Sequence, residues 1–76
     1  MTKKIKIYGA GSIGNHLAYS ATLLKNNVEV VDLDPKALNR MKTSIFPSRY
    51  KKWNNNIKLT LLKNDKDFDH DYYFIG

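Results

Sequence analysis

The sequence predicts an α/β fold with a parallel β-sheet, and three observations lead to this class. Apolar or alternating stretches are interleaved with helical patterns in the order strand, helix, strand, helix, strand, strand. The segments after the first two strands are long enough to be right-handed crossovers between parallel strands. A glycine-rich turn joins the first strand to the first helix. We therefore expect about four strands in the spatial order 3-2-1-4, with helices after strands 1 and 2.

The first strand is predicted at residues 5–8, where Ile5 and Ile7 alternate with Lys6 and Tyr8. Lys6 is unusual there, because a central parallel strand is normally covered on both faces and reads as a continuous apolar run. The lysine indicates either a sheet without cover on one face or a side chain whose ammonium group reaches water.

The first helix is predicted from Ser12 to about Lys25. Its apolar side is expected to consist of residues spaced by four, four and three positions, namely Ile13, Leu17, Ala21 and Leu24. Asn26 and Asn27 are expected to end the helix, because asparagine tolerates the left-handed conformation. Residues 28–34 are β-branched and apolar up to Asp32, which is typical of a buried second strand.

The second helix is predicted to begin at Asp34 and Pro35, because an aspartate accepts hydrogen bonds from first-turn amides and proline suits the first helical position. Its apolar side is assigned to Ala37, Leu38 and Met41. We therefore expect this helix to pack on the sheet beside the first one.

Residues 44–56 are less regular, but an aromatic stripe recurs there at helical spacing: Phe46, Tyr50 and Trp53. Packing of this stripe against the lower edge of the sheet is the favoured interpretation, and a partner-binding face is the alternative. Residues 57–62 alternate as a third strand, residues 63–71 form a polar connection, and residues 72–76 are the fourth strand.

The glycines form the pattern G-x-G-x-x-G at Gly9, Gly11 and Gly14, in the turn between the first strand and the first helix. In a Rossmann (doubly wound) sheet the first glycine permits the tight turn, the second allows close approach of a pyrophosphate, and the third allows close helix packing. The amides of Ser12 and Ile13 would then point at the phosphates from the positive end of the helix.

An acidic residue ends the second strand 18 positions after the third glycine, as this fingerprint requires. Asp32 is predicted to bind the ribose hydroxyls of the cofactor and to repel a 2′-phosphate. Leu33 stands where an arginine could have bound that phosphate, so NAD is favoured over NADP. Arg40 and Lys36 are near enough in sequence to keep NADP possible, and a glycine turn without any nucleotide is the remaining alternative.

Length and composition narrow the class of protein. The chain has 76 residues, 42% of them hydrophobic, so it holds at most one small globular domain. It has no cysteine, no apolar signal region and no membrane-spanning stretch, so we expect a cytoplasmic protein with no membrane partner.

The net charge is +6, and no acidic residue occurs between residues 36 and 58. We interpret this basic stretch as a solvated face and expect no nucleic-acid partner, with residues 50–53 as the alternative nucleic-acid contact.

No catalytic residue and no metal site are predicted from the sequence. The acidic residues between 65 and 71 faintly resemble a calcium loop, but His70 and Gly76 occupy the positions that require glycine and glutamate. His16 is interpreted as a surface or packing residue of the first helix. His70 has acidic neighbours but no nucleophile near it in sequence.

Three stretches resemble the amino-terminal segment of the Gfo/Idh/MocA oxidoreductases, the family of glucose-fructose oxidoreductase and inositol dehydrogenase: "KIKIYGAGSIGNHLA", "VEVVDLDPKAL" and "DYYFIG". The stretch "IFPSRYKKWNNNIKL" resembles one subgroup of that family. The resemblance implies that Gly9, Gly11, Ser12, Ile13 and Gly14 form the pyrophosphate turn and that Asp32 is the ribose-binding acid. It also implies NAD(P) as cofactor and a sugar or polyol as substrate.

Members of that family continue with a Thr/Pro-rich loop, a lysine-containing catalytic motif and a substrate domain, none of which is found in residues 1–76. We therefore expect a single, incomplete NAD(P)-binding domain that alone binds the adenosine and pyrophosphate half of NAD weakly or not at all and does not catalyse a reaction. The alternative is a regulatory nucleotide-sensing module of the potassium-transport type. A homo-oligomer could form through an exposed sheet edge or through the aromatic stripe Phe46, Tyr50 and Trp53.

Overall fold

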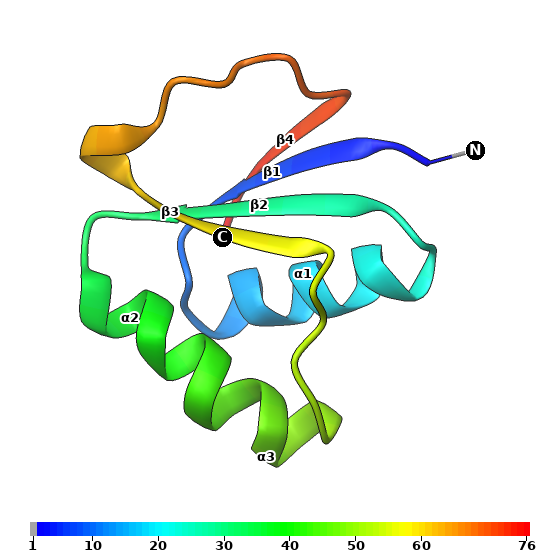
Figure 1. Ribbon diagram of the computed structural model, residues 1–76, viewed down its shortest axis with the longest axis vertical. Coiled ribbons are helices and arrows are strands. Elements are labelled where there is room, and N and C mark those ends of the chain that lie inside the picture. The colour runs from blue at the N-terminus through cyan, green and yellow to red at the C-terminus, as the bar shows by residue number, and fades with distance from the viewer. Residues whose placement is uncertain (1) are drawn as a thin grey trace.

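The computed structural model describes residues 2–76 and contains one four-stranded sheet (Figure 1). All strand pairs are parallel and the spatial order is β3-β2-β1-β4, which confirms the predicted fold class and strand order. The strand bounds differ from the predicted ones by no more than two residues: β1 Lys4–Tyr8, β2 Asn27–Asp32, β3 Ile57–Leu61 and β4 Tyr72–Ile75.

Side chains on the two faces of the sheet differ in chemistry. In the register of the sheet, Ile7 lies beside Val30 on β2 and Phe74 on β4. Because side chains alternate along a strand, these residues share the face that α1 and α2 cover. Lys6 and Glu29 are partners in the neighbouring register position and lie on the opposite face.

Helix α1 (Ser12–Leu23) follows β1 as predicted, but only half of its predicted apolar side is confirmed, because Leu17 and Ala21 pack on the core and the other two residues do not. Ile13 is 65% exposed and Leu24 is 76% exposed. The buried residues are small or polar, namely Gly14, Asn15, Ala18, Ala21 and Thr22. Small side chains let the helix axis approach the sheet closely, whereas larger ones would hold it away. The chain leaves the helix through Lys25, which takes the left-handed conformation (φ 61°) instead of an asparagine.

The second helical segment consists of α2 (Pro35–Arg40), the π-helical turn η1 (Met41–Ile45) and α3 (Phe46–Tyr50). Its predicted start is confirmed, because Asp34 Oδ1 accepts a hydrogen bond from the Lys36 amide at 2.9 Å.

None of the helices that the structure describes has the length and the apolar character needed to cross a membrane.

The aromatic stripe packs inside the molecule. Phe46 is buried, and the rings of Tyr50 and Trp53 contact it edge-on with centroids 4.9 and 5.0 Å away. Tyr50 also stacks on Tyr19 of α1, with ring centroids 3.8 Å apart. The stripe therefore joins α3 to α1, and Phe46 contributes to no surface that a partner could contact.

Residues 62–71, which we call the strap, connect β3 to β4 and begin with the 3₁₀ turn η2 (Leu62–Asn64). The strap crosses the sheet on the face opposite α1 and α2 (Figure 1). Lys6 lies beneath it and is completely buried. Both explanations that the sequence suggested for Lys6, an uncovered face and an ammonium group in water, are therefore wrong.

Candidate functional site

The glycine turn between β1 and α1 is shaped by two close backbone contacts. Gly9 has a φ of +112°, a conformation that other residues rarely adopt. A Cβ atom on Gly14 would lie 1.9 Å from the carbonyl oxygen of Gly9. These two positions therefore require glycine to fold the turn, whether or not a ligand binds there.

Gly11 differs from the other two glycines. It is the N-cap residue of α1, and a Cβ atom there would meet no atom of residues 2–76 within 4 Å. No side chain in the described part of the chain caps the helix. The first-turn amides, which include those of Ser12 and Ile13, thus begin a 12-residue helix next to open space. Open space and uncapped amides are what a bound phosphate group needs.

Asp32 ends β2 beside this turn. Its Oδ2 accepts a hydrogen bond from the Ala10 amide at 2.8 Å, and its Oδ1 accepts one from the Asp34 amide at 2.8 Å. Each carboxylate oxygen has a second lone pair, so the same carboxylate can still accept hydrogen bonds from a sugar hydroxyl. Asp32 therefore holds the glycine turn against β2 and remains half-buried at the edge of the site.

A cavity of about 280 Å³ opens between the start of α1, the end of β2 and the second helical segment. Gly11, Ser12 and Asp32 line it, which brings together three of the predicted cofactor-binding residues. Arg40 and Arg49 also line it, whereas Lys36 does not. Two guanidinium groups and one carboxylate give the cavity a net positive charge, which suits an anionic ligand.

Arg49 was missed by sequence reasoning. It lies 17 positions after Asp32, and only the course of α2 and α3 brings it back to the glycine turn. No spacing rule in the sequence connects these two residues.

Asn15 was missed as well, and it is the most buried polar side chain of the cavity wall, only 2% exposed. Its Nδ2 donates hydrogen bonds to the carbonyl oxygens of Ala10 and Gly11 at 2.8 and 2.7 Å. Its Oδ1 has no hydrogen-bond partner among residues 2–76. Asn15 therefore stabilises the glycine turn through these two hydrogen bonds, and its Oδ1 can still accept one.

A second group of charged side chains is buried under the strap, away from this cavity. The Lys6 ammonium group donates hydrogen bonds to Asp65 Oδ1 and to the carbonyl oxygen of Asp67, and it lies 3.4 Å from Glu29 Oε1. The Tyr8 hydroxyl donates to Asp65 Oδ2 at 2.8 Å. We call Lys6, Glu29 and Asp65 the buried ion cluster.

The contacts around the buried ion cluster shift the pKa values of Lys6, Asp65 and the adjacent Tyr8. Burial alone would lower the pKa of Lys6, but the hydrogen bond to Asp65 and the attraction of Glu29 outweigh it and raise that pKa above its ordinary 10.5. The hydrogen bond from Lys6 lowers the pKa of Asp65 below its ordinary 3.8. Donation to Asp65 raises the pKa of Tyr8. All three shifts favour a charged lysine–aspartate pair and a neutral tyrosine.

Comparison of the chain with protein-family models, with curated proteins and with solved structures finds no match. Function is therefore inferred from the geometry of the cavity and from the sequence motifs. His16 is exposed on α1, and it does not line the cavity.

Proposed function

We propose that this chain is the dinucleotide-binding segment of an oxidoreductase, with NAD as the cofactor. The observation that supports this most strongly is the uncapped start of α1, with open space at Gly11 and a carboxylate at the end of β2. The resemblance to the Gfo/Idh/MocA oxidoreductases supports a sugar or polyol as the substrate of the complete reaction. We assign no catalytic residue to the described part of the chain.

Different residues bind different parts of the cofactor. The pyrophosphate lies over Gly11, where it accepts hydrogen bonds from the amides of Ser12 and Ile13 and is attracted by the helix dipole. Asp32 accepts hydrogen bonds from the adenosine ribose hydroxyls. When bound, the cofactor supplies the hydride chemistry, and the protein supplies position and charge.

The choice between NAD and NADP depends on opposing charges at one cavity. The Asp32 carboxylate disfavours a 2′-phosphate and occupies the place of the ribose contact. Arg40 and Arg49 lie at the same cavity and would attract such a phosphate. We favour NAD because a buried or half-buried carboxylate next to a dianionic phosphate is unfavourable unless it is protonated.

Amide chemical shifts of ¹⁵N-labelled chain, recorded during titration with NAD, NADP and ADP, test the proposal and detect weak binding. We expect NAD to shift the amides of residues 10–14 and Asp32 first, with weaker binding of NADP. Gly11→Asn should abolish these shifts while keeping a good N-cap residue, so the fold should remain. Arg49→Ala should lower the affinity for NAD about tenfold, because the cavity loses a guanidinium group that can donate to the pyrophosphate, and a hydrogen bond to a charged group contributes about 1.5–3 kcal/mol.

The matched control is Lys63→Ala, which removes an exposed positive charge from the strap. It should leave the titration unchanged. Absence of shifts at residues 10–14 in millimolar NAD, or equal effects of Lys63→Ala and Arg49→Ala, would contradict the proposal. A preference for NADP would contradict the assigned role of Asp32.

A further inference from the structure

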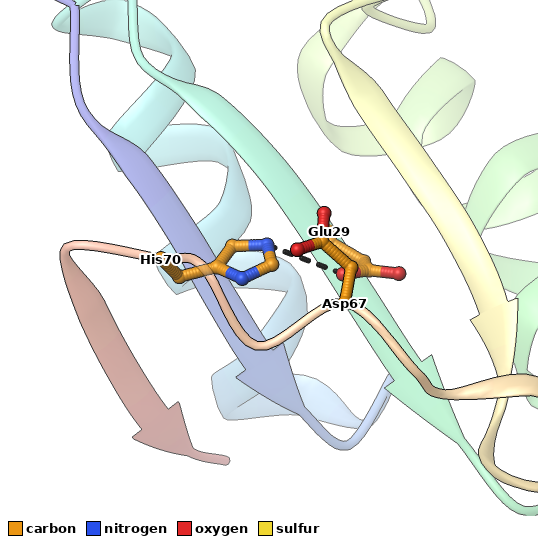
Figure 2. A group of neighbouring side chains, drawn as sticks. All are labelled: Glu29, Asp67 and His70. Atoms are coloured by element: carbon orange, nitrogen blue, oxygen red, sulfur yellow. Dashed lines mark ion pairs between the residues drawn. The ribbon is translucent and has the colours of Figure 1, made fainter.

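Three potential metal ligands meet under the strap, on the face of the sheet opposite α1 and α2. Glu29 comes from β2, and Asp67 and His70 come from the strap (Figure 2). One ligand atom from each lies within 4.8 Å of the others. Figure 2 shows the His70 ring and the Asp67 side chain turned toward the Glu29 carboxylate.

The cluster contains a buried carboxylate oxygen that lacks a hydrogen bond. Glu29 is only 5% exposed, and its Oε2 accepts a hydrogen bond from the Thr60 hydroxyl at 2.6 Å. Its Oε1 has no hydrogen-bond partner in the described chain, although it faces His70 Nε2 at 3.2 Å and the Lys6 ammonium group, which is hydrogen-bonded to Asp65, at 3.4 Å. The His70 side chain is also buried, and its Nδ1 has no hydrogen-bond partner within residues 2–76. A buried oxygen in this state is stabilised by a cation.

The spacing is compatible with ligands of a transition-metal ion as well as with a direct contact between the two side chains. Bonds from Zn²⁺ to imidazole nitrogen and carboxylate oxygen are about 2.0–2.2 Å long, so two ligands of a tetrahedral ion lie roughly 3.3–3.5 Å apart. The 3.2 Å from His70 Nε2 to Glu29 Oε1 is close to this value. A cavity of about 230 Å³ borders Glu29, Asp67 and His70 and has room for water as a further ligand.

The ammonium groups of Lys4 and Lys6 lie near the Asp67 and Glu29 carboxylates, but both carboxylates can still bind an ion. Lys4 lies 3.5 Å from Asp67 Oδ2, but both side chains are nearly half exposed, so Lys4 can turn into solvent. Lys6 lies near Glu29 but keeps Asp65 as its hydrogen-bonded partner. An ion held by Glu29 and Asp67 therefore meets one imidazole and two carboxylates, and the charge of the nearby Lys6 ammonium group is compensated by Asp65.

We propose that Glu29, Asp67 and His70 bind a divalent transition-metal ion of the Zn²⁺ class and so fasten the strap to β2. Imidazole with carboxylate suits Zn²⁺, whereas Mg²⁺ and Ca²⁺ prefer oxygen ligands alone. The site does not depend on the nucleotide. The calcium-loop comparison could not find it, because that comparison considered residues 65–76 only and Glu29 lies on another strand.

Calorimetric titration of the metal-stripped chain with ZnCl₂, in a buffer that does not bind metal, tests the proposal. We expect one Zn²⁺ per chain, with a higher melting temperature in Zn²⁺ than in chelator. His70→Gln and Asp67→Asn should each lower the Zn²⁺ affinity by at least about tenfold, since loss of even an outer-shell partner costs about 10- to 100-fold. MgCl₂ should give no heat of binding at the same concentration.

The matched controls change the exposed histidine, His16→Gln, and the exposed strap aspartate Asp69→Asn. Both should bind Zn²⁺ like the original chain. Circular dichroism of each variant in chelator separates loss of binding from loss of fold. Equal affinity in His70→Gln and His16→Gln, or no Zn²⁺ binding by the original folded chain, would overturn the proposal and leave a simple ion pair between His70 and Glu29.

Discussion

The two faces of the sheet are buried by different means. The face under α1 and α2 is apolar, with Ile7 and Val30 completely buried. The face under the strap buries charged residues, and Lys6 is as deeply enclosed as those two aliphatic side chains. The first face depends on close packing between backbone and small side chains, and the second depends on compensation of charge. Substitutions on the two faces should therefore change the stability of the fold by different amounts, and different second substitutions should restore it.

The largest expected effect is loss of the positive charge under the strap. Lys6→Met should destabilise the fold by about 3–5 kcal/mol, because Asp65 and Glu29 would remain buried without their cation. Neutralising all three groups in Lys6→Met/Glu29→Gln/Asp65→Asn should recover most of this loss, since no uncompensated charge remains. Urea denaturation measures both variants.

The control for this experiment is Lys63→Met, which removes an exposed lysine of the strap and should change stability by less than about 0.5 kcal/mol. Similar losses in Lys6→Met and Lys63→Met would show that the buried ion cluster is not a source of stability.

A smaller effect is expected from crowding the helix-covered face. Gly14→Ser should cost about 1–3 kcal/mol or more, because its Cβ would lie 1.9 Å from the Gly9 carbonyl oxygen and α1 would have to move. Gly11→Ser is the matched variant, since it adds the same side chain where no described atom lies within 4 Å and where serine is a favourable N-cap. In thermal melts, Gly14→Ser should have a lower melting temperature than Gly11→Ser. Equal melting temperatures would contradict the close contact of α1 with the turn.

The smallest effect is a pH dependence that belongs to the strap face. The folded pKa of Asp65 is lowered, so its contribution to stability is present above pH 3.8 and is lost as pH falls through the folded pKa. The folded pKa of Lys6 is raised, so its contribution is present below pH 10.5 and is lost as pH rises through the folded pKa. Urea denaturation as a function of pH should show both losses.

The triple variant Lys6→Met/Glu29→Gln/Asp65→Asn should show a flatter pH profile at both ends, whereas Asp69→Asn should keep the original shape. If the triple variant and the original chain had the same profile, the pH dependence would come from groups outside the buried ion cluster.

Local patterns were sufficient for most of the fold. The strand order followed from the sequence of elements, and the Asp34 cap was predicted because capping involves residues only a few positions apart. The side of α1 that faces the sheet was predicted correctly for Leu17 and Ala21 and wrongly for Ile13 and Leu24, because apolar spacing does not reveal how near a helix must approach its sheet. Gly14 and Ala18 are buried there for their small size, while Ile13 is exposed.

The candidate cofactor site was predictable only in part. The glycine turn and Asp32 belong to one motif with known spacing, and the structure brings Gly11, Ser12 and Asp32 to one cavity. Arg49 and the unpaired oxygen of Asn15 gave no signal, because their positions depend on the path of α3 and on the packing of α1.

The sequence by itself determined the order of strands and helices and the glycine turn, because periodicity, capping and turn chemistry act over a few neighbouring residues. Only the tertiary structure decided what surrounds Lys6 and which residue Glu29 faces. The charges that meet on this face are far apart in the chain, 23 positions for Lys6 and Glu29 and 59 for Lys6 and Asp65, so their compensation depends on the strap and on the strand register. The physical reason is that electrostatic interactions depend on distance in space and on burial, neither of which local sequence contains.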